Sequence, residues 1–332
     1  MLIFIPHLFP DARLLEAAAQ NLRLPALETL LARGSLRSGP AEGTEAALCQ
    51  AFGIVRQQDW PLAPVTLEAD GQPADGAYWL RADPVHLRVM RDRIVLADSR
   101  ALGLSQHQAE ILSASIGQHF GDALQPIPLH PQRWYLRFPH PPRLATTPLS
   151  TATGRDIDPL QPQGEDAQRF RALLNELQML LFAHPVNQAR EARGELPINS
   201  LWLWGGGARP APTRSALPLY AHDHEACSIG RFCGIQAQPV PSRLEKSHLE
   251  KKGVILLDAL TPAGQCNDAY GWREALGAME KDWFAPLLGA LRAVGPQGLQ
   301  LSDPVNGKTL HLQRTDAWKI WRRPKNLLAT TD

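Results

Sequence analysis

Histidine and carboxylate side chains stand close together at one point of this 332-residue chain, in the run His222-Asp223-His224-Glu225. Imidazole and carboxylate groups ligate zinc and related ions, and alternate residues of a strand point the same way, so His222 and His224 are candidate metal ligands. No helical HExxH and no cysteine pair accompanies them. Four polar residues after a proline-rich loop are more often simply solvated, and that interpretation is favoured.

Three glycines, Gly205-Gly206-Gly207, follow an apolar run that predicts a strand over 199–204. Glycines at a strand end either make a tight exit from the strand or let a ligand approach the backbone closely. The spacing matches neither GxGxxG nor a P-loop. The tight exit is therefore favoured over a ligand site.

Arginines form a third group of candidates. Arg81 stands with Asp83 and His86, Arg133 begins a predicted strand, and the segment 184–194 is dense in hydrogen-bonding side chains. Guanidinium forks suit carboxylate and phosphate groups because they bond to them through two parallel hydrogen bonds. Structural ion pairs would produce the same residues, so both interpretations stay open.

These residues depend on elements that the sequence also predicts. A buried strand over 1–9 and a helix over 11–34, interrupted at Pro25 and capped by Gly34, open the chain as an α/β fold does. Ser105 and Gln108 predict a capping box at the start of a further helix. Further helices are predicted over 44–52, 165–183 and 272–294. Strands are predicted over 93–97, 134–138, 199–204, 253–258, 299–302, 309–313 and 318–321. The last three strands should form an antiparallel meander, with the turn Asn306-Gly307 between its first two strands.

Composition excludes several classes of function. The net charge is +1, so no global field draws the chain to nucleic acid or to a membrane. The basic aromatic segment Trp318–Lys325 is too short to make nucleic-acid binding expected. The apolar start is broken by Pro6, and no run approaches the length of a membrane span, so neither a signal peptide nor a membrane partner is expected. Four cysteines without a pairing pattern suit reduced thiols. We expect a cytoplasmic protein.

The residues Arg81-Ala82-Asp83-Pro84, the strand at Arg133 and above all the segment 184–207 (HPVNQAREARGELPINSLWLWGGG) resemble archaeal-type cofactor-independent phosphoglycerate mutases of the alkaline phosphatase superfamily. The nearest likeness is to a proteobacterial branch described as phosphoglycerate mutase-like or as regulators of pathogenicity factors. The resemblance implies an α/β fold: an alkaline phosphatase-like core sheet with helices on both faces, from residues 1–71 and 197–332, and an inserted smaller α+β substrate-clamp domain at 72–196.

The resemblance also implies a catalytic centre with two divalent cations, manganese or zinc, and a serine nucleophile, and this chain departs from it. His7 follows the first strand where the family has a metal-binding aspartate, and Thr44 stands at the nucleophile-like position. Thr261 and Gln265 replace a later metal-binding pair, and Asp303 is kept without its histidine. The candidate ligands for a rebuilt site are His222, His224, Asp258 and Asp303.

The substrate clamp of the family, in contrast, is kept. The resemblance assigns ligand binding to Arg81, Arg133, Asn187, Arg190 and Asn199, which in the family close over a carboxylate and a phosphate. The structural alternative is that Asp83, Glu191 and Asp158 neutralise the arginines within the domain.

Three hypotheses follow. The first is a catalytically degenerate member of this family, without a cofactor, that binds a small phosphorylated or carboxylated anion or regulates another process. The second is an active metal-dependent phosphomutase or phosphatase with a rebuilt metal site. The third is a protein-interaction module, motivated by nine tryptophans and proline-rich loops, and it leaves a protein partner open.

Overall fold

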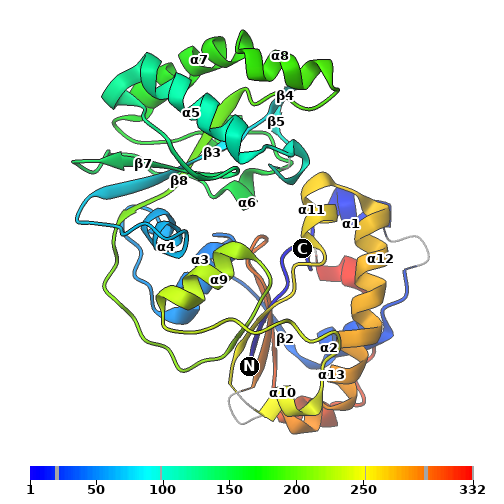
Figure 1. Cartoon of the computed structure of the whole chain (residues 1–332). Coiled ribbons are helices and arrows are strands. Elements are labelled where there is room, and N and C mark those ends of the chain that lie inside the picture. Colours follow the sequence, from blue (N-terminus) through cyan, green and yellow to red (C-terminus); the bar gives the residue numbers. More distant parts are fainter. Residues whose placement is uncertain (19–21, 98, 251, 295–297, 331–332) are drawn as a thin grey trace. The chain divides into compact units, whose positions relative to one another are not determined.

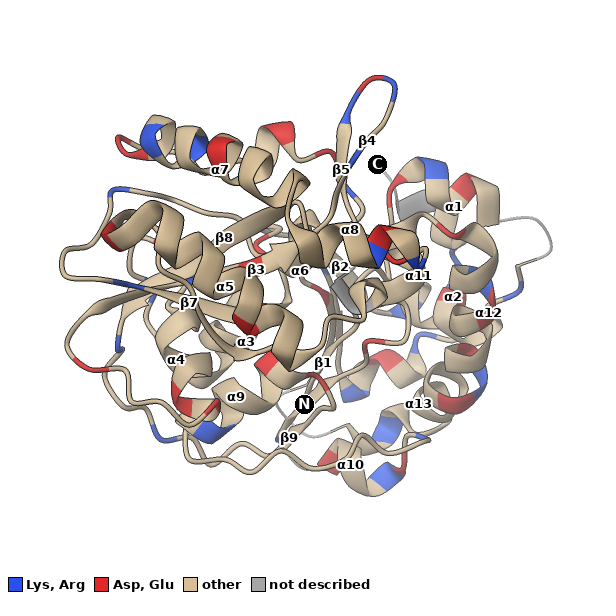
Figure 2. Cartoon of the chain, turned by 45° about the horizontal axis from the view of Figure 1, so that its top comes forward, with Lys and Arg blue, Asp and Glu red and all other residues tan. Residues whose placement is uncertain are grey.

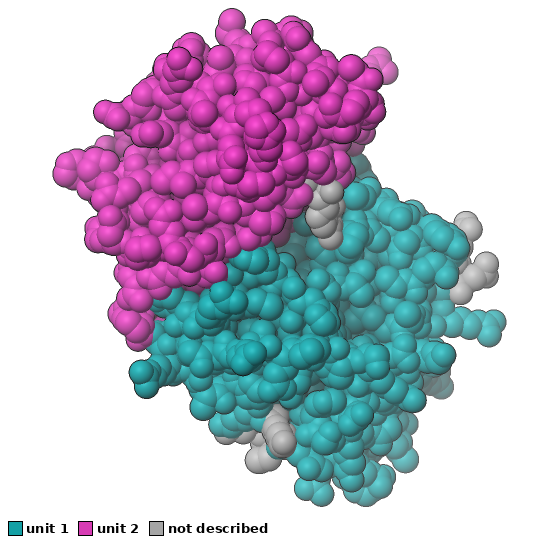
Figure 3. Space-filling model, viewed as in Figure 1, with its two compact units in different colours: residues 1–52, 213–332 teal, residues 53–212 magenta. Residues whose placement is uncertain are grey.

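The computed structural model describes residues 1–18, 22–97, 99–250, 252–294 and 298–330. The chain divides into two compact units, one of Met1–Phe52 with Thr213–Asp332 and one of Gly53–Pro212, coloured separately in Figure 3. Basic and acidic residues are interspersed along both units (Figure 2), in keeping with the net charge of +1. None of the described helices is both long enough and apolar enough to cross a membrane.

The first unit contains a six-stranded sheet with strands in the order β2-β12-β11-β1-β10-β9. β11, β1, β10 and β9 run parallel, and β12 and β2 complete one edge in antiparallel pairing. A parallel strand covered on both faces is apolar along its length, as the run Leu2-Ile3-Phe4 is. The strands are β1 (Leu2–Phe4), β2 (Ser35–Ser38), β9 (Leu219–Tyr220), β10 (Val254–Leu256), β11 (Leu299–Asp303) and β12 (Lys308–Leu312).

Helices lie on both faces of this sheet (Figure 1). Four of them, α1 (Ala12–Ala18), α2 (Pro25–Arg33), α12 (Ala269–Met279) and α13 (Ala285–Gly289), contribute to one large apolar core. On the other face α3 (Thr44–Phe52) packs against α9 (His224–Phe232). The unit also contains the short helices α10 (Lys246–Glu250) and α11 (Thr261–Cys266).

The second unit contains a four-stranded antiparallel sheet in the order β6-β7-β3-β8. One apolar core joins this sheet to α5 and α7, and a smaller one joins it to α4 through Ala63, Leu67, Trp79 and Tyr135. The elements are α4 (Leu62–Ala69), β3 (Tyr78–Val85), β4 (Leu87–Val89), β5 (Ile94–Leu96), α5 (Gln106–Phe120), β6 (Ile127–His130), β7 (Arg133–Phe138), α6 (Leu149–Ala152), α7 (Ala167–Phe182), α8 (Pro185–Ala192) and β8 (Ser200–Ala208). The capping box of Ser105 and Gln108 is present at the start of α5.

The predicted fold class is confirmed: the first unit has an α/β sheet with helices on both faces, and the second is a smaller α+β unit. Sequence analysis placed the domain boundaries at 71/72 and 196/197, whereas the two compact units divide at 52/53 and 212/213. The difference has a physical basis. α4 packs on β3 and β8, and β8 pairs with β3 along most of its length, so both elements belong with the second unit.

Sequence analysis expected the strand to end at residue 204, before the three glycines, but the glycines are part of the strand. β8 continues to Ala208, and the glycines allow protein rather than ligand to approach the backbone. A Cβ on Gly206 would lie 2.2 Å from the hydroxyl of Tyr78, and one on Gly207 would lie 2.5 Å from Pro61. Gly34 is the C-cap of α2, as predicted, and its N–H donates to the carbonyl of Leu30 at 2.8 Å. Its backbone is extended rather than left-handed, with φ of −78°, and a Cβ there would meet β12.

The third strand of the expected carboxy-terminal meander is absent from the described residues. β11 and β12 form the hairpin around Asn306-Gly307 as predicted, with Gly307 at φ +65°. β12 then pairs with β2 on its other side, so no edge is left for residues 318–321. The chain leaves the sheet after β12 through a 3-10 helix, Arg314–Trp318, and residues 320 and 321 form a turn.

Candidate functional site

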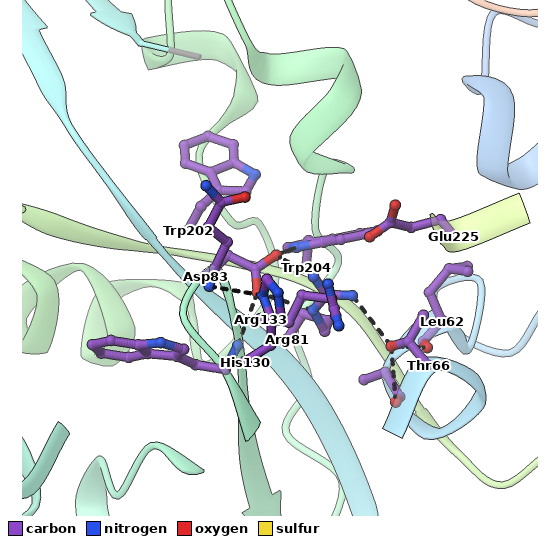
Figure 4. A network of polar contacts seen from close by, with 12 residues as sticks. Leu62, Thr66, Arg81, Asp83, His130, Arg133, Trp202, Trp204 and Glu225 are labelled. Carbon is purple, nitrogen blue, oxygen red and sulfur yellow. Dashed lines mark hydrogen bonds and ion pairs between the residues drawn. The ribbon is translucent and has the colours of Figure 1, made fainter. Parts of the chain in front are cut away.

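Arg81 and Asp83 form a buried ion pair on β3 in the second unit (Figure 4). Alternate residues of a strand share a face, so the two side chains meet directly. Nε and Nη2 of Arg81 donate to the two carboxylate oxygens of Asp83 at 2.9 and 2.8 Å. Both side chains are almost completely excluded from solvent. The guanidinium that sequence analysis assigned to a ligand therefore already has a carboxylate partner within its own strand.

Aromatic residues enclose this pair. The guanidinium carbon of Arg81 lies 4.8 Å from the ring centroid of Trp204 and 5.4 Å from that of Tyr135. Asp83 also accepts a hydrogen bond from Nε1 of Trp204 at 2.7 Å and one from the backbone N–H of Trp134 at 3.1 Å. Burial raises the pKa of Asp83, and the charge of Arg81 opposes that rise. A carboxylate with four donors in a cage of rings is fully engaged within the protein.

Arg133, at the start of β7, has a carboxylate partner of its own. Its Nε and Nη2 donate to Asp70 at 2.9 and 2.8 Å, and the hydroxyl of Tyr135 donates to the same carboxylate at 2.7 Å. The side chain of Arg133 keeps 16% of its surface exposed, against 2% for Arg81. Its third nitrogen, Nη1, lies outside the pair with Asp70. Of the arginines assigned to ligand binding, Arg133 is the one that retains solvent access.

Arg190 on α8 is bound to the main chain around it. Nε donates to the carbonyl of Leu196 at 2.9 Å, Nη1 to the side chain of Gln108 at 3.0 Å, and Nη2 to the carbonyl of Leu102. Glu195 lies 3.3 Å away and completes the charge balance. The guanidinium ties α8 to the start of α5 and to the segment before β8.

The side-chain amides of the two asparagines in the predicted site each pair with a backbone N–H and C=O, as a neighbouring strand would. Asn187 exchanges hydrogen bonds with the N–H and C=O of Ile198, at 2.9 and 2.7 Å. Asn199 does the same with Leu87, at 2.7 and 2.9 Å. The conspicuous segment 184–199 is thus a hydrogen-bonded connection between α7, α8 and β8.

The structure therefore brings together only part of the predicted set. Arg81 and Arg133 lie on neighbouring strands and share Tyr135, while Arg190, Asn187 and Asn199 hold the connection into β8. The alternative prediction, that acidic residues of the same domain neutralise the arginines, is correct for Asp83, which pairs with Arg81. The partners of the other two arginines are Asp70 and Glu195, in place of Asp158 and Glu191.

In the first unit, Asp303 organises the turn that follows the first strand. Its Oδ1 accepts the backbone N–H groups of His7, Val305 and Asn306 at 3.1 to 3.2 Å. Its Oδ2 accepts the N–H of Phe9 at 2.9 Å and the amide of Asn306 at 3.0 Å. Asp303 is completely buried, and burial raises its pKa while these hydrogen bonds oppose the rise. Five donors occupy both oxygens, which have about four lone-pair positions between them.

The other metal candidates do not form a ligand shell with Asp303 among the described residues. Gly43 donates to the carbonyl of Pro304, which places Thr44, the first residue of α3, beside the Asp303 turn. Asp258 and His222 are exposed, and Nε2 of His222 accepts a hydrogen bond from Val240. Within the part of the chain that the structure describes, no group of three or more histidine, cysteine or acidic residues is placed to hold a metal ion. The residues present do not fit the two-cation centre that the resemblance implies.

A cavity of about 360 Å³ lies next to this turn, lined among others by Phe4, Glu42, Gly43, Ser302 and Asp303. Its volume falls within the range of small-molecule sites. The described residues that line it include two acids and no lysine, arginine or histidine. Its charge therefore does not suit a phosphate or carboxylate ligand.

Acidic groups converge on Asp223, which caps α9 by accepting the N–H of Ala226 at 2.8 Å. Burial, followed by repulsion from Glu225, Glu45 and Asp258, raises the pKa of Asp223 to about 8. Sequence analysis favoured simple solvation for residues 222–225 and kept a strand-like metal motif as the alternative. They are instead the start of a helix, so His222 and His224 are not alternate residues of one strand.

Sequence reasoning missed Asp70, Thr66 and Tyr135. Thr66 accepts from Nη1 of Arg81 at 3.2 Å, and Asp70 holds Arg133. Both lie on or just after α4, in a stretch interpreted as loop, so no pattern marked them. The alternation of β7 did mark Tyr135 as one side of a strand, but not its hydroxyl contact.

Comparison with known proteins finds similar sequences among phosphoglycerate mutases. No protein-family model matches the chain. Over 202 residues, 58% of the chain, it is 27% identical to a 2,3-bisphosphoglycerate-independent phosphoglycerate mutase of Methanosarcina mazei. Over 203 residues it is 27% identical to a probable enzyme of the same name from Geobacter sulfurreducens. The homologues of this chain are cofactor-independent phosphoglycerate mutases. The chain spans about half the length of these two curated relatives.

A solved structure shows the same fold. The PH0037 protein from Pyrococcus horikoshii is 16% identical and has a TM-score of 0.52, with 99% of this chain and 91% of that one covered. At this identity the similarity establishes the fold alone. The relationship to phosphoglycerate mutases rests on the sequence matches.

Proposed function

We propose that this chain is a phosphoglycerate mutase-like protein that has lost turnover and acts as a small-anion-binding or regulatory protein. The observation that carries the proposal is the set of hydrogen bonds that the carboxylate of Asp303 accepts. Five N–H donors of the protein surround the one acidic residue kept from the family's metal ligands. A carboxylate engaged in this way would have to give up these bonds to ligate a cation.

The nucleophile-like position supports the same proposal. A threonine hydroxyl is a weak nucleophile unless a base or a metal activates it. Thr44 begins α3, where its own helix and the Asp303 turn surround it. Replacing Thr44 by alanine is therefore expected to leave the biological role of the protein nearly unchanged.

The anion is proposed to bind at Arg133. Asp70 binds Nε and Nη2 of this guanidinium, which keeps solvent access. The guanidinium carbon of Arg81 lies 5.4 Å from the ring centroid of Tyr135, whose hydroxyl donates to the same Asp70. Arg81 and Arg190 are buried, and protein groups bind their guanidinium nitrogens. Their contribution to ligand binding would be indirect: they hold β3 and the segment before β8 in place around Arg133. A phosphoglycerate-like acid is the first ligand to test, because the homologues are phosphoglycerate mutases.

One observation favours the alternative, an active metal-dependent phosphomutase or phosphatase. Burial, followed by repulsion from Glu225, Glu45 and Asp258, raises the pKa of Asp223, and a cation would relieve this crowding of carboxylates. No catalytic step is derived from it, because the described residues do not form a ligand shell.

Metal analysis with an activity assay separates the two. Purified full-length protein is dialysed against manganese or zinc, its metal content is measured, and phosphate release from a generic ester and interconversion of phosphoglycerates are followed. The proposal expects substoichiometric metal and rates equal to those of the Thr44→Ala variant. Stoichiometric metal, together with turnover that Thr44→Ala abolishes, would overturn it.

A further inference from the structure

Three large apolar side chains are exposed within four residues near the carboxy end of the first unit. Trp318, Ile320 and Trp321 keep 59%, 74% and 73% of their surface in solvent. Single exposed apolar residues are ordinary on protein surfaces, but a contiguous group marks an interaction site. The chain has left the sheet here, so these side chains do not contribute to its core.

The backbone that carries them is fastened to α2. Nη1 of Arg322 donates to the carbonyl of Ala32 at 3.0 Å, and the N–H of Lys325 donates to the carbonyl of Glu28 at 3.0 Å. Nζ of Lys319 donates to the carbonyl of Arg33 at 3.3 Å. These hydrogen bonds fix the backbone that carries the exposed side chains. Binding a partner therefore does not have to pay the entropy of ordering this segment.

Positive charge surrounds the apolar group. The guanidinium carbon of Arg292 lies 4.0 Å from the ring centroid of Trp318, and Arg322, Arg323 and Lys325 are exposed. Asp316, the acidic residue of this segment, is buried and paired with Lys319 at 2.6 Å. We call Trp318, Ile320, Trp321, Arg292, Arg322, Arg323 and Lys325 the aromatic–basic patch.

We propose that the aromatic–basic patch binds the protein to the surface of an anionic lipid bilayer. Tryptophan rings favour the boundary between headgroups and acyl chains, and an aliphatic side chain such as Ile320 gains by entering the acyl region. Arginine and lysine beside them bind lipid phosphates and are attracted by a negative surface potential. Sequence analysis expected no membrane partner because the net charge of the whole chain is near zero and no segment could span a bilayer. Peripheral binding needs neither, because a local basic group beside exposed apolar side chains suffices.

Two observations favour lipid over nucleic acid. Single-stranded nucleic acid binds by stacking its bases on successive free aromatic faces. Here Ile320 stands between the two tryptophans and has no such face, and the guanidinium of Arg292 already covers one face of Trp318. An apolar side chain exposed to this degree among cations matches the chemistry of a lipid interface instead.

Sedimentation with vesicles tests the proposal on the full-length chain. Vesicles of phosphatidylcholine mixed with phosphatidylglycerol are compared with vesicles of phosphatidylcholine alone. We expect binding to the anionic vesicles only, weakened by added salt because the attraction is screened. Arg323→Gln should weaken binding about fivefold, the factor that corresponds to a single basic residue near a charged membrane. Ile320→Ser and Trp321→Ala should each weaken it at least as much.

Matched controls come from the second unit. Phe182 is 84% exposed on α7, and Arg91 is exposed in the loop between β4 and β5. Phe182→Ala and Arg91→Gln should bind vesicles as the parent does, and all variants should melt at the parent temperature because the changed side chains are exposed. Equal loss in Phe182→Ala and Trp321→Ala would overturn the proposal.

Two further outcomes would also overturn it. Absence of the parent protein from the vesicle pellet would exclude lipid. Dissociation of a dimer by Trp321→Ala in gel filtration, or loss of binding to a single-stranded oligonucleotide without loss of vesicle binding, would assign the patch to a second copy of the chain or to nucleic acid.

Discussion

Arg81 and Asp83 stand two residues apart on one strand and join through two parallel hydrogen bonds of 2.9 and 2.8 Å. The pair is local in sequence, yet it fixes contacts that are remote. Asp83 also holds Trp134 on β7 and Trp204 on β8, the two strands that flank β3. One carboxylate thus sets the register of three neighbouring strands, a role that buried polar groups fill when all their bonds are satisfied.

Removing that carboxylate should destabilise the second unit strongly. Asp83→Ala leaves the guanidinium of Arg81 buried without its counter-charge, so the free energy of unfolding should fall by about 3–5 kcal/mol. Urea denaturation followed by tryptophan fluorescence measures it. The exposed pair of Arg137 and Asp75 is the control, and Asp75→Ala should change stability little because solvent screens that pair. Equal losses in the two variants would show that Asp83 has no special structural role.

The glycine run of β8 gives a second prediction. A Cβ on Gly206 would lie 2.2 Å from the hydroxyl oxygen of Tyr78, inside the buried sheet. Gly206→Ala should therefore lower the free energy of unfolding by about 1–3 kcal/mol through overpacking. Gly277, within α12, has no atom near its missing Cβ, so Gly277→Ala should raise stability by about 0.4–1 kcal/mol. Thermal melts of both variants test the sign, and a stabilised Gly206→Ala would contradict the close approach.

Stability should depend on pH through Asp223. Its pKa is raised from 3.8 to about 8 in the folded chain, chiefly by burial and by Glu225. Between those two values the folded chain holds a proton that the unfolded chain has released. The free energy of unfolding therefore falls as the pH rises from about 4 to 8. Asp223→Asn cannot ionise and still caps α9, so it should be more stable than the parent at pH 8, on the order of 2 kcal/mol.

Melting temperatures at pH 6 and pH 8 test this expectation. The drop between the two values should be smaller in Asp223→Asn than in the parent. Asp268→Asn is the matched control, because Asp268 caps α12 in the same way, through Gly271, at an exposed position. If the two variants have the same pH profile, the acidic surroundings of Asp223 do not govern stability.

Much of the fold could be predicted from the sequence, because local patterns decide it. The stripe of Phe170, Leu177 and Leu181 marked α7, the pair Ser105 and Gln108 marked the start of α5, and Asn306-Gly307 marked the hairpin. β2 and α4 were missed for a different reason. Their residues lie in a stretch rich in loop-forming types, and their strand pairing and burial depend on segments far away in sequence.

The candidate site was harder to predict, because residue type does not show which partner a side chain finds. Arg190 carries the charge of an anion-binding residue, but three oxygens of the protein bind it. One is the carbonyl of Leu196, six residues away, and the other two belong to Gln108 and Leu102, in segments far away in sequence. Arg133 finds Asp70, a residue that no motif distinguished. Only Asp83, two residues from Arg81 on the same strand, could be expected from spacing alone.

Anion binding at Arg133 is the prediction that bears most directly on the proposed function. A ligand that binds the folded chain raises its melting temperature in a concentration-dependent way, and 3-phosphoglycerate at millimolar concentration is the probe. Arg133→Gln should abolish the rise, since it removes a charge-assisted hydrogen bond worth about 1.5–3 kcal/mol. Arg137→Gln is the control, because Arg137 lies on the same strand and carries an exposed ion pair. It should keep the rise.

Glycerol and sulfate are the control solutes, because each resembles only one part of a phosphorylated acid. Neither should raise the melting temperature as much as 3-phosphoglycerate does. If 3-phosphoglycerate leaves the melting temperature of the parent unchanged, or if Arg133→Gln responds as the parent does, Arg133 serves only to hold Asp70 and the anion-binding proposal fails.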